Sequence, residues 1–316
     1  VATDLDIVFY DEIREVKVSK DGSTTTSAAI LYDILRKISP NSELNFVLKS
    51  ENKLSLKTDN SDFNLLCLST DNFPTFTDEF EGQEILLDNK RFLRLLNKTK
   101  ISISNDDTRH YLNGIYLHLT EAHGRNFLTG VATDSHRLSS SSVEIDNIDN
   151  FSSLILPRKT VFQLCSLLAE SSEKLEMQTS ENKIKFRLGK VKLISKVIDG
   201  KFPDYKKVVP TSNEKSLIVS SKDFVNSIER VASVSLDRKE GVKLVINKEN
   251  IQLSVNSANS GEGNEIIKAN FNSNNLNISF NSKYLIDIAS EIEAKDLKMN
   301  LKDSVSPVLI EDASDK

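Results

Sequence analysis

Apolar residues recur at helical spacing in three places along the chain. In each place they fall at positions i, i+3, i+4 and i+7, which puts them on one face of an amphipathic helix. The three stripes are Leu31, Ile34, Leu35 and Ile38; Val161, Leu164, Cys165 and Leu168; and Leu285, Ile288, Ala289 and Ile292. The second stripe begins 130 residues after the first (161 − 31) and the third 124 residues after the second (285 − 161). The pattern therefore predicts three copies of one helix.

Segments that alternate between apolar and polar residues lie near each stripe. Residues 44–56, 184–197 and 242–255 are rich in β-branched and other apolar side chains and predict strands with one buried face. A further helix precedes these strands in two copies, at residues 90–98 and 222–234. The chain therefore predicts an α+β fold in which a unit of helices and antiparallel sheet is repeated.

Short motifs repeat in the same register. The pairs are Val1-Ala2-Thr3-Asp4 with Val131-Ala132-Thr133-Asp134, Ser50-Glu51-Asn52-Lys53-Leu54 with Ser180-Glu181-Asn182-Lys183-Ile184, and Phe73-Pro74-Thr75-Phe76 with Phe202-Pro203-Asp204-Tyr205. Their offsets are 130 (131 − 1), 130 (180 − 50) and 129 (202 − 73) residues, and a constant offset indicates tandem repeats. We predict three domains, at 1–81, 82–208 and 209–316. The first is expected to lack its opening strands and first helix, and the third its closing strand.

Composition narrows the class of protein. The 316 residues are 38% hydrophobic and 28% charged, which is typical of a soluble globular protein. No apolar run reaches the roughly 18 residues of a membrane-spanning helix, and no signal peptide is visible, so we expect a cytoplasmic protein. Cys67 and Cys165 are predicted to be buried thiols in a reducing compartment. A net charge of −5 argues against a protein that coats nucleic acid with its whole surface but leaves room for a local basic region.

The most basic local feature is the helix predicted at 89–100. At 100° per residue, Lys90, Arg94 and Lys98 fall on one face, with Arg91 beside them. Four cations on one face suggest a phosphate-facing surface, but taken alone such a run of charge is more often a solvated helix face. Arg109, His110 and Tyr111 follow in a predicted turn and add a cation and stacking groups.

The segment Thr133-Asp134-Ser135-His136-Arg137-Leu138 contains the residue types of a hydrolase triad. Triads are assembled from distant segments, and the Gly-x-Ser-x-Gly elbow is missing from the sequence. The matching segment of the first repeat, Leu5-Asp6-Ile7, has neither Ser nor His. The four histidines have no metal-ligand spacing, so we expect no metal, no cofactor and no active site. Two rivals remain: a hydrolase that uses Asp134 and His136, and an adaptor that binds proteins but never DNA.

Three ordered motifs carry a specific resemblance. They are Val131-Ala132-Thr133-Asp134-Ser135-His136-Arg137-Leu138, Ile155-Leu156-Pro157-Arg158-Lys159 and Asp199-Gly200-Lys201-Phe202-Pro203-Asp204-Tyr205, joined by Tyr111-Leu112-Asn113-Gly114 and Asp303-Ser304-Val305. In order and spacing they are similar to the β subunits of bacterial DNA polymerase III, the sliding clamps. The resemblance implies three tandem clamp domains, each with two helices packed on antiparallel sheets. It also implies a ring of two chains joined head to tail, with no enzymatic activity, which encircles duplex DNA and tethers the polymerase for processive synthesis.

The resemblance also implies positions for three surfaces. DNA-facing residues are Lys90, Arg91, Arg94, Lys98, Arg109 and Tyr111, with Arg36, Lys159 and Arg230 as weaker candidates. A groove for short linear motifs comprises Leu112, Thr133, Ser135, His136, Arg137, Leu138, Pro203, Lys207, Val208, Asn281, Tyr284, Val305 and Pro307; for Leu138 and Val208, ordinary core packing is the alternative. The ring contact comprises Ile34, Ile38, Phe63, Leu65, Ser233 and Val234.

The implied partners are sequence-independent duplex DNA, a second copy of the chain, the DNA polymerase III alpha subunit, the clamp loader, and other polymerases and repair proteins; no membrane is among them. The chain departs from the family pattern at five positions in or beside these surfaces. His110 stands where Tyr is usual, Ser135 where Gly is usual, Lys207 where Arg is usual, Pro307 where Ser is found, and Ser233 where an apolar residue is usual.

Overall fold

The computed structural model describes residues 1–76, 80, 82, 84–146, 151–235 and 241–313. These residues form two compact units, which are described one at a time. The grouping differs from the three predicted domains because strands from the middle of the chain join the N-terminal strands in one sheet. Residue 81 and residues 314–316, which the predicted domain ranges include, lie outside the described residues. The boundaries at 81/82 and 208/209 stay predictions.

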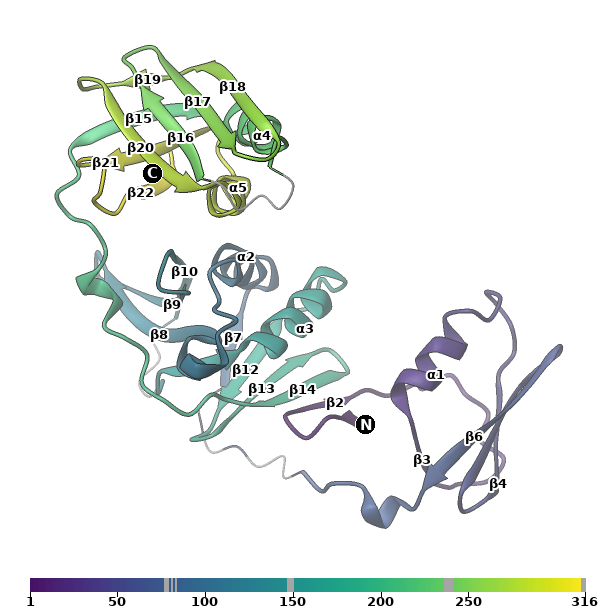
Figure 1. The fold of residues 1–316 in the computed structure, drawn as a ribbon. Coiled ribbons are helices and arrows are strands. Elements are labelled where there is room, and N and C mark those ends of the chain that lie inside the picture. The colour runs from purple at the N-terminus through teal and green to yellow at the C-terminus, as the bar shows by residue number, and fades with distance from the viewer. Residues whose placement is uncertain (77–79, 81, 83, 147–150, 236–240, 314–316) are drawn as a thin grey trace. The chain divides into compact units, whose positions relative to one another are not determined.

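The first unit is built on two sheets and one helix (Figure 1). Its six-stranded sheet has the order β1-β2-β14-β13-β12-β7, and its four-stranded sheet the order β3-β6-β5-β4. The elements are β1 Ala2–Thr3, β2 Ile7–Tyr10, β3 Thr25–Thr26, α1 Ala28–Leu35, β4 Asn45–Ser50, β5 Lys53–Thr58, β6 Ser61–Leu68, the 3-10 helix η1 Thr70–Asn72, β7 Glu84–Leu87, β12 Leu175–Thr179, β13 Lys183–Leu188 and β14 Val191–Lys196.

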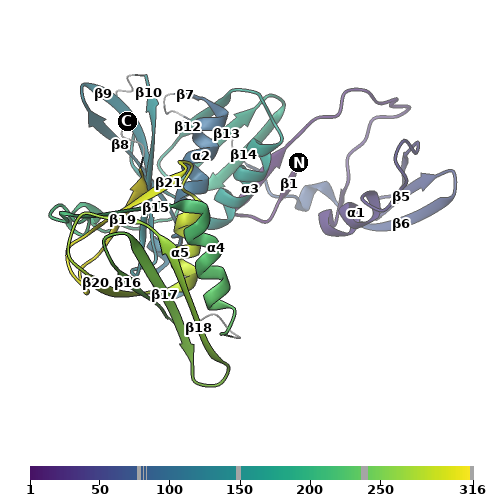
Figure 2. The same ribbon diagram turned by 90° about the horizontal axis from the view of Figure 1, so that it is seen from above.

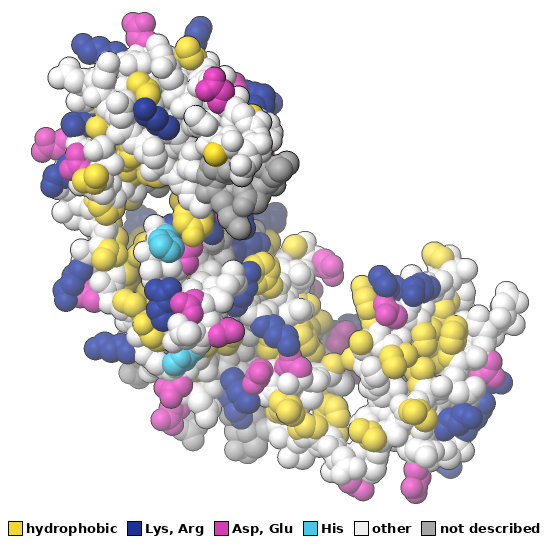
Figure 3. Space-filling view, in the orientation of Figure 1, with side chains coloured by type: hydrophobic (Ala, Val, Ile, Leu, Met, Phe, Trp, Pro, Cys, Tyr) yellow, Lys and Arg dark blue, Asp and Glu magenta, His cyan; other side chains and the backbone are white. Residues whose placement is uncertain are grey.

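Alternation of apolar and charged residues along a strand explains how the six-stranded sheet buries one of its faces. In β13, Ile184, Phe186 and Leu188 are buried while the Lys and Arg residues between them point to the other face. The core beneath the four-stranded sheet is small, with Leu54, Leu65 and Cys67 buried and Leu31 and Ile34 packed against them. Apolar side chains remain exposed over α1 and the strands beside it, where yellow atoms gather in Figure 3.

The second unit holds the remaining helices. Its three sheets have the orders β10-β9-β8-β11, β19-β15-β21-β22 and β18-β17-β16-β20. The elements are α2 Asn89–Lys100, the 3-10 helix η2 Asp107–Leu112, β8 Gly114–Ala122, β9 Arg125–Thr133, β10 Leu138–Ile145, β11 Leu154–Pro157, α3 Arg158–Ala169, the 3-10 helix η3 Tyr205–Lys207, β15 Lys215–Ser220, α4 Ser221–Ala232, β16 Gly241–Ile246, β17 Asn250–Ser257, β18 Gly261–Lys268, β19 Asn270–Phe271, β20 Leu276–Asn281, α5 Ser282–Ser290, β21 Asp296–Leu301 and β22 Leu309–Asp312.

Helices α4 and α5 lie side by side against the sheet β18-β17-β16-β20 (Figures 1 and 2). Their apolar faces close a continuous core that includes Phe224, Ile228 and Leu285 together with Leu244 and Leu253 from the strands. Polar side chains cap the start of each helix, since Ser220 accepts a hydrogen bond from the amide of Asp223 and Asn281 from that of Tyr284. The repeated helix-on-sheet unit predicted from the sequence is therefore confirmed.

The predicted apolar stripes are correct in place, but two of the helices end earlier than expected. Ile38 lies beyond α1 and Ile292 beyond α5. The amides of both residues bond three residues back, to Leu35 and Ala289, so the last turn tightens and the α-helix stops. After α1, Pro40 also disfavours helical geometry in the residue before it.

Candidate DNA-facing surface and partner groove

Helix α2 has the two faces that its sequence predicts. Phe92, Leu95 and Leu96 are completely buried, whereas Lys90 and Arg91 are exposed. Because the apolar residues fix the rotation of the helix, the cations are held on the opposite side from the core. The predicted amphipathic character of α2 is confirmed.

Two of the α2 cations are engaged by carboxylates that follow α5. The Nε atom of Arg94 lies 2.7 Å from Oε1 and 2.8 Å from Oε2 of Glu293. Lys98 donates a hydrogen bond to the backbone carbonyl of Glu291, and its Nζ lies 3.5 Å from Glu293 and 3.8 Å from Asp312. The Lys98 side chain is 14% exposed, against 44% for Arg94. This geometry does not support the expectation that Lys98 faces DNA. The Lys98 ammonium instead binds oxygen atoms of the segment after α5 and of β22.

Two carboxyl groups near these cations, those of Asp312 and Glu291, have shifted pKa values. Burial raises the pKa of Asp312, but hydrogen bonds from the amides of Ala294 and Glu293, with the charges of Lys98 and Arg94, outweigh burial and leave the pKa below its ordinary value. Burial also raises the pKa of Glu291, and here it prevails over the charges of Lys100 and Lys98. Asp312 therefore stays charged, and keeps its ion pair with Lys98, to a lower pH than an ordinary aspartate would.

The predicted turn with Arg109, His110 and Tyr111 is the 3-10 helix η2. Nε of Arg109 bonds Oδ2 of Asp106 at 2.9 Å and its Nη1 donates to Ser135 Oγ at 2.6 Å. Hydrogen bonds from Thr108, followed by that from Arg109, hold the pKa of Asp106 below its usual range. The His110 ring contacts the Asp199 carbonyl at 3.2 Å, and Tyr111 packs partly into an apolar cluster. Arg109 and His110 thus remain accessible while Tyr111 is half-buried.

The weaker DNA-facing candidates also have neighbours. Arg36 pairs with Asp33 at 2.8 Å, and Lys159 is exposed on the first turn of α3. Arg230 forms a two-point contact with Glu265, at 2.5 Å and 3.0 Å, and this hydrogen bonding raises the pKa of the guanidinium and lowers that of the carboxyl. Arg230 could therefore bind a phosphate only if its two hydrogen bonds to Glu265 were broken.

The segment from Thr133 to Leu138 is a tight turn between β9 and β10. Oδ1 of Asp134 accepts the amides of His136 and Arg137 at 2.9 and 3.0 Å, and the Thr133 hydroxyl donates to the Arg137 carbonyl at 2.7 Å. Ser135 has φ = +76°, the left-handed region that favours glycine, so the family's usual Gly at this position has a conformational reason.

The same turn occurs at the first repeat of the motif. Asp4 Oδ1 accepts the amides of Asp6 and Ile7 at 3.0 and 2.9 Å, Thr3 donates to the Ile7 carbonyl, and Leu5 has φ = +79°. The Val-Ala-Thr-Asp motif is therefore a structural turn. Its aspartate caps backbone amides and is not a catalytic group, which removes the basis for the hydrolase alternative.

The predicted groove residues of the second domain surround an apolar cluster. Leu112, Val131, Ile155 and Phe202 are buried, and Leu138 packs against them while remaining half-exposed. Val208 is 62% exposed, so the alternative that it is an ordinary core residue is wrong. Pro203 is exposed shortly before η3, and Lys207 is exposed at the end of η3. The Leu138 side chain is thus packed against the apolar cluster on one side and accessible to solvent on the other.

A stack of rings fixes the segment that carries Pro203, Lys207 and Val208. Phe202 lies parallel to Tyr116 at 4.9 Å between centroids, and Tyr116 stacks on His118 at 4.8 Å. Nδ1 of His118 contacts the Leu119 carbonyl at 3.0 Å, which can only accept, so this nitrogen carries the proton. Nε2 then accepts from the Tyr205 hydroxyl at 3.1 Å. Burial lowers the pKa of His118 and raises that of Tyr205.

This arrangement predicts a pH-dependent stability. Because the folded state holds the pKa of His118 below its unfolded value, the stability that neutral His118 provides is present at neutral pH and is lost as the pH falls below 6.5 through the lowered pKa. We expect the urea midpoint to fall between pH 7.5 and 5.5, and the fall to shrink in His118→Phe. His123→Gln, at an exposed turn, is the matched control and should leave the pH dependence unchanged. An equal fall in wild type and His118→Phe would contradict the assignment.

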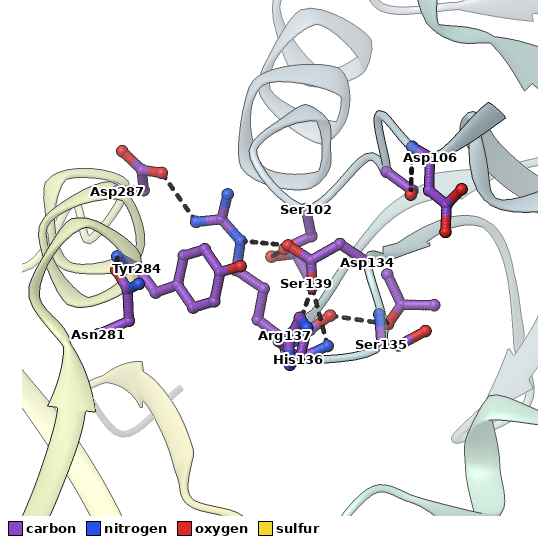
Figure 4. A network of polar contacts seen from close by, with 12 residues as sticks. Ser102, Asp106, Asp134, Ser135, His136, Arg137, Ser139, Asn281, Tyr284 and Asp287 are labelled. Carbon is purple, nitrogen blue, oxygen red and sulfur yellow. Dashed lines mark hydrogen bonds and ion pairs between the residues drawn. The ribbon is translucent and has the colours of Figure 1, made fainter. Parts of the chain in front are cut away.

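The groove residues of the third domain lie around the start of α5 and a later turn. Asn281 caps α5, and Tyr284 is half-buried under the guanidinium of Arg137, whose Cζ lies 4.3 Å from the ring centroid. The ring of His136 lies 6.2 Å from that of Tyr284 (Figure 4). Val305 is 89% exposed in a turn closed by Asp303, and Pro307 is exposed nearby in sequence. The structure thus brings Arg137, His136 and Tyr284 together.

The residues expected at the ring contact differ in how exposed they are. Ile34, Ile38 and Phe63 line a hollow of about 440 Å³ beside α1. Leu65, by contrast, is 8% exposed and belongs to the small core of this region, so its predicted role at the surface is not supported. Ser233 is exposed just after α4, and Val234 is packed against the core of the third domain.

Sequence reasoning missed three acidic residues that contact predicted site cations. Asp287, Glu293 and Asp312 lie within 4 Å of Arg137, Arg94 and Lys98. No local pattern marks them, because each lies 150 or more residues from its partner in the sequence. Within the described part of the chain, no cluster of His, Cys, Asp and Glu is arranged to hold a metal ion, and no helix is long and apolar enough to cross a membrane.

Comparison with known proteins decides the family. Family models for the N-terminal, central and C-terminal domains of the DNA polymerase III beta subunit match residues 1–77, 86–204 and 206–316. The chain belongs to this family. A beta sliding clamp of Caulobacter vibrioides is 32% identical over 99% of the chain and 85% of that relative, and one of Escherichia coli K12 is 31% identical over 99% and 84%. A DnaN sliding clamp of Bartonella birtlesii, solved with griselimycin, has a TM-score of 0.94 at 37% identity and covers 100% of this chain and 84% of that one.

Membership of the beta subunit family fixes the general function. The chain is a DNA polymerase processivity clamp with three tandem clamp domains, and it has no catalytic activity of its own. The two alternative functions considered from the sequence are therefore wrong: the chain is neither a hydrolase nor an adaptor that binds proteins but not DNA.

Proposed function

We propose that this beta subunit closes head to tail with a second copy around duplex DNA in the cytoplasm, and that it receives short linear motifs beside Leu138. The observation that carries the proposal is a partly open apolar site in the central domain, on a chain whose domains all match the sliding clamp family. The partners we propose are the DNA polymerase III alpha subunit, the clamp loader, and other polymerases and repair proteins.

The DNA-facing surface we propose centres on the first turn of α2. Lys90 and Arg91 are exposed there, and Arg94 is partly exposed despite its pairing with Glu293. Phosphate contacts of this kind carry no sequence information and weaken with salt, which suits a ring that slides. Arg109 and His110 extend the same proposal to η2.

The ring contact we propose uses the hollow beside α1. Ile34, Ile38 and Phe63 give it an apolar wall, and the segment after α4 with Ser233 and Val234 is the surface that would enter it. A head-to-tail contact between two such surfaces closes with twofold symmetry if the rotation is right. Ser233 offers less apolar area than the residue usual in the family, so we expect a weaker dimer.

Substitution of the α2 cations tests the DNA-facing surface. In Lys90→Ala/Arg91→Ala, two phosphate contacts are removed per chain, so we expect loading onto nicked circular DNA to fall about threefold to tenfold at physiological salt. Lys248→Ala/Lys268→Ala, which removes two exposed cations from the third domain, is the control with the same charge change. Loading is measured with labelled protein by gel filtration of the DNA complex. Equal losses in both variants would show that total charge, and not this surface, is responsible.

A further inference from the structure

Asp287 lies beside the proposed groove although neither the sequence nor the family resemblance singles it out. Its Oδ2 atom is 2.8 Å from Nη1 of Arg137. The Nε atom of the same guanidinium lies 3.1 Å from Oδ2 of Asp134. Figure 4 shows the guanidinium of Arg137 between the two carboxylates, one from the turn before β10 and the other from α5.

The geometry of α5 brings Asp287 and Tyr284 to the same cation. They are three residues apart, so they share one face of the helix. Arg137 lies on that face, with Cζ 4.3 Å from the Tyr284 ring centroid. Asp287 also stands in the second half of α5, near the negative end of the helix dipole, where a carboxylate is unfavourable without a cation. Arg137 supplies that cation.

The charge of this cluster is the second observation. One guanidinium faces two carboxylates, so the group carries a formal charge of −1 at neutral pH. The Arg137 side chain is 12% exposed and those of Asp134 and Asp287 are 16% and 28% exposed. The positive charge of Arg137 is therefore already compensated, and it offers an incoming carboxylate little attraction.

We infer that Asp287 is a positioning and specificity residue of the groove: it holds Arg137 over the Tyr284 ring and cancels its charge, so that the groove prefers motifs that carry no carboxylate. The inference rests on the proposed function of the groove. Asp287 acts through Arg137 and does not itself contact the motif.

The first arm of the test needs no peptide. Phenylglyoxal modifies accessible guanidinium groups, and tryptic peptides report the rate at each arginine. In the wild-type full-length protein, Arg137 should react more slowly than Arg14 and Arg125, whose side chains are 67% and 66% exposed. Asp287→Asn should raise the rate at Arg137 about threefold or more, while Glu293→Gln, which frees Arg94 instead, should leave it unchanged. An unchanged rate at Arg137 in Asp287→Asn would overturn the inference whatever the groove binds.

The second arm compares two labelled peptides by fluorescence polarisation, Gln-x-x-Leu-Phe and its Glu-x-x-Leu-Phe counterpart. Wild type should prefer the neutral peptide. Asp287→Asn should weaken the neutral peptide about threefold to tenfold and reduce the preference, and Asp287→Glu, which restores the charge, should restore the preference. Equal losses for both peptides would show a merely structural role and contradict the specificity claim. Failure of wild type to bind either peptide refutes the groove itself, while the phenylglyoxal rates still decide whether Asp287 holds Arg137.

Discussion

Replacing Leu138 by Asp is expected to abolish binding of a Gln-x-x-Leu-Phe peptide. Leu138 packs against the buried residues Leu112, Val131, Ile155 and Phe202. Water therefore reaches a side chain at this position only from the open side of the groove. A carboxylate there would lose hydration against an apolar wall when the peptide closes the open side, at a cost of about 2–5 kcal/mol. An affinity of roughly micromolar strength should weaken about 30-fold or more. Fluorescence polarisation with the full-length protein measures the loss.

The control for this prediction is Ile266→Asp. Ile266 is 64% exposed on β18, so it receives the same change of chemistry away from the groove. Circular dichroism and the oligomeric state should match wild type in both variants, because Leu138 is half-exposed and lies outside the proposed ring contact. Equal peptide binding by wild type and Leu138→Asp would show that the groove has been misplaced.

The second large effect concerns retention on DNA. A clamp loaded on a nicked circle should stay through gel filtration and should be lost almost completely when the circle is cut once. The physical reason is that weak phosphate contacts do not by themselves retain the protein, whereas a closed ring cannot leave a closed circle. Direct affinity for linear duplex should be low and should fall further with salt. The fraction of labelled protein that coelutes with DNA before and after cutting measures the effect.

Salt gives this prediction an internal control. Raising the salt concentration should strip the protein from linear duplex but leave protein on uncut circles, because topology is not screened. Equal retention on linear and circular DNA, or sequence-selective binding to linear DNA, would mean that direct contacts and not encirclement hold the protein.

The repeated architecture could be predicted from the sequence because it depends on local periodicity. The stripe that begins at Val161 and the cationic face of α2 both follow from spacing of 3.6 residues per turn, and the structure contains both helices. The Val-Ala-Thr-Asp repeat is also explained, since the same hydrogen bonds form at Asp4 and Asp134. Ends of helices were less predictable, because the last turns of α1 and α5 tighten into three-residue hydrogen bonding that the apolar pattern does not show.

The electrostatics of the site could not be predicted from one segment at a time. Lys98 has the sequence context of a solvated or phosphate-facing cation, yet carboxylate and carbonyl oxygens about 190 to 215 residues away cover it. Leu65 falls on an apolar strand position that is compatible with either surface or core, and its neighbours Leu54 and Cys67 place it in the core. The role of Asp287 depends on a helix that meets a turn 150 residues earlier.

Covalent closure of the ring tests the central claim most directly. In the full-length protein, Ile38→Cys and Ser233→Cys would place one thiol on each side of the proposed ring contact, and a bismaleimide would join them across two chains; the native Cys67 and Cys165 are buried. The clamp is first loaded on a nicked circle and then cross-linked, the sample is denatured with detergent, and protein that remains with DNA is measured. If the chain encircles DNA, denatured protein stays linked to the circle and is released by one double-strand cut. Loss of all protein from the intact circle after detergent, despite complete cross-linking at both contacts, would contradict encirclement.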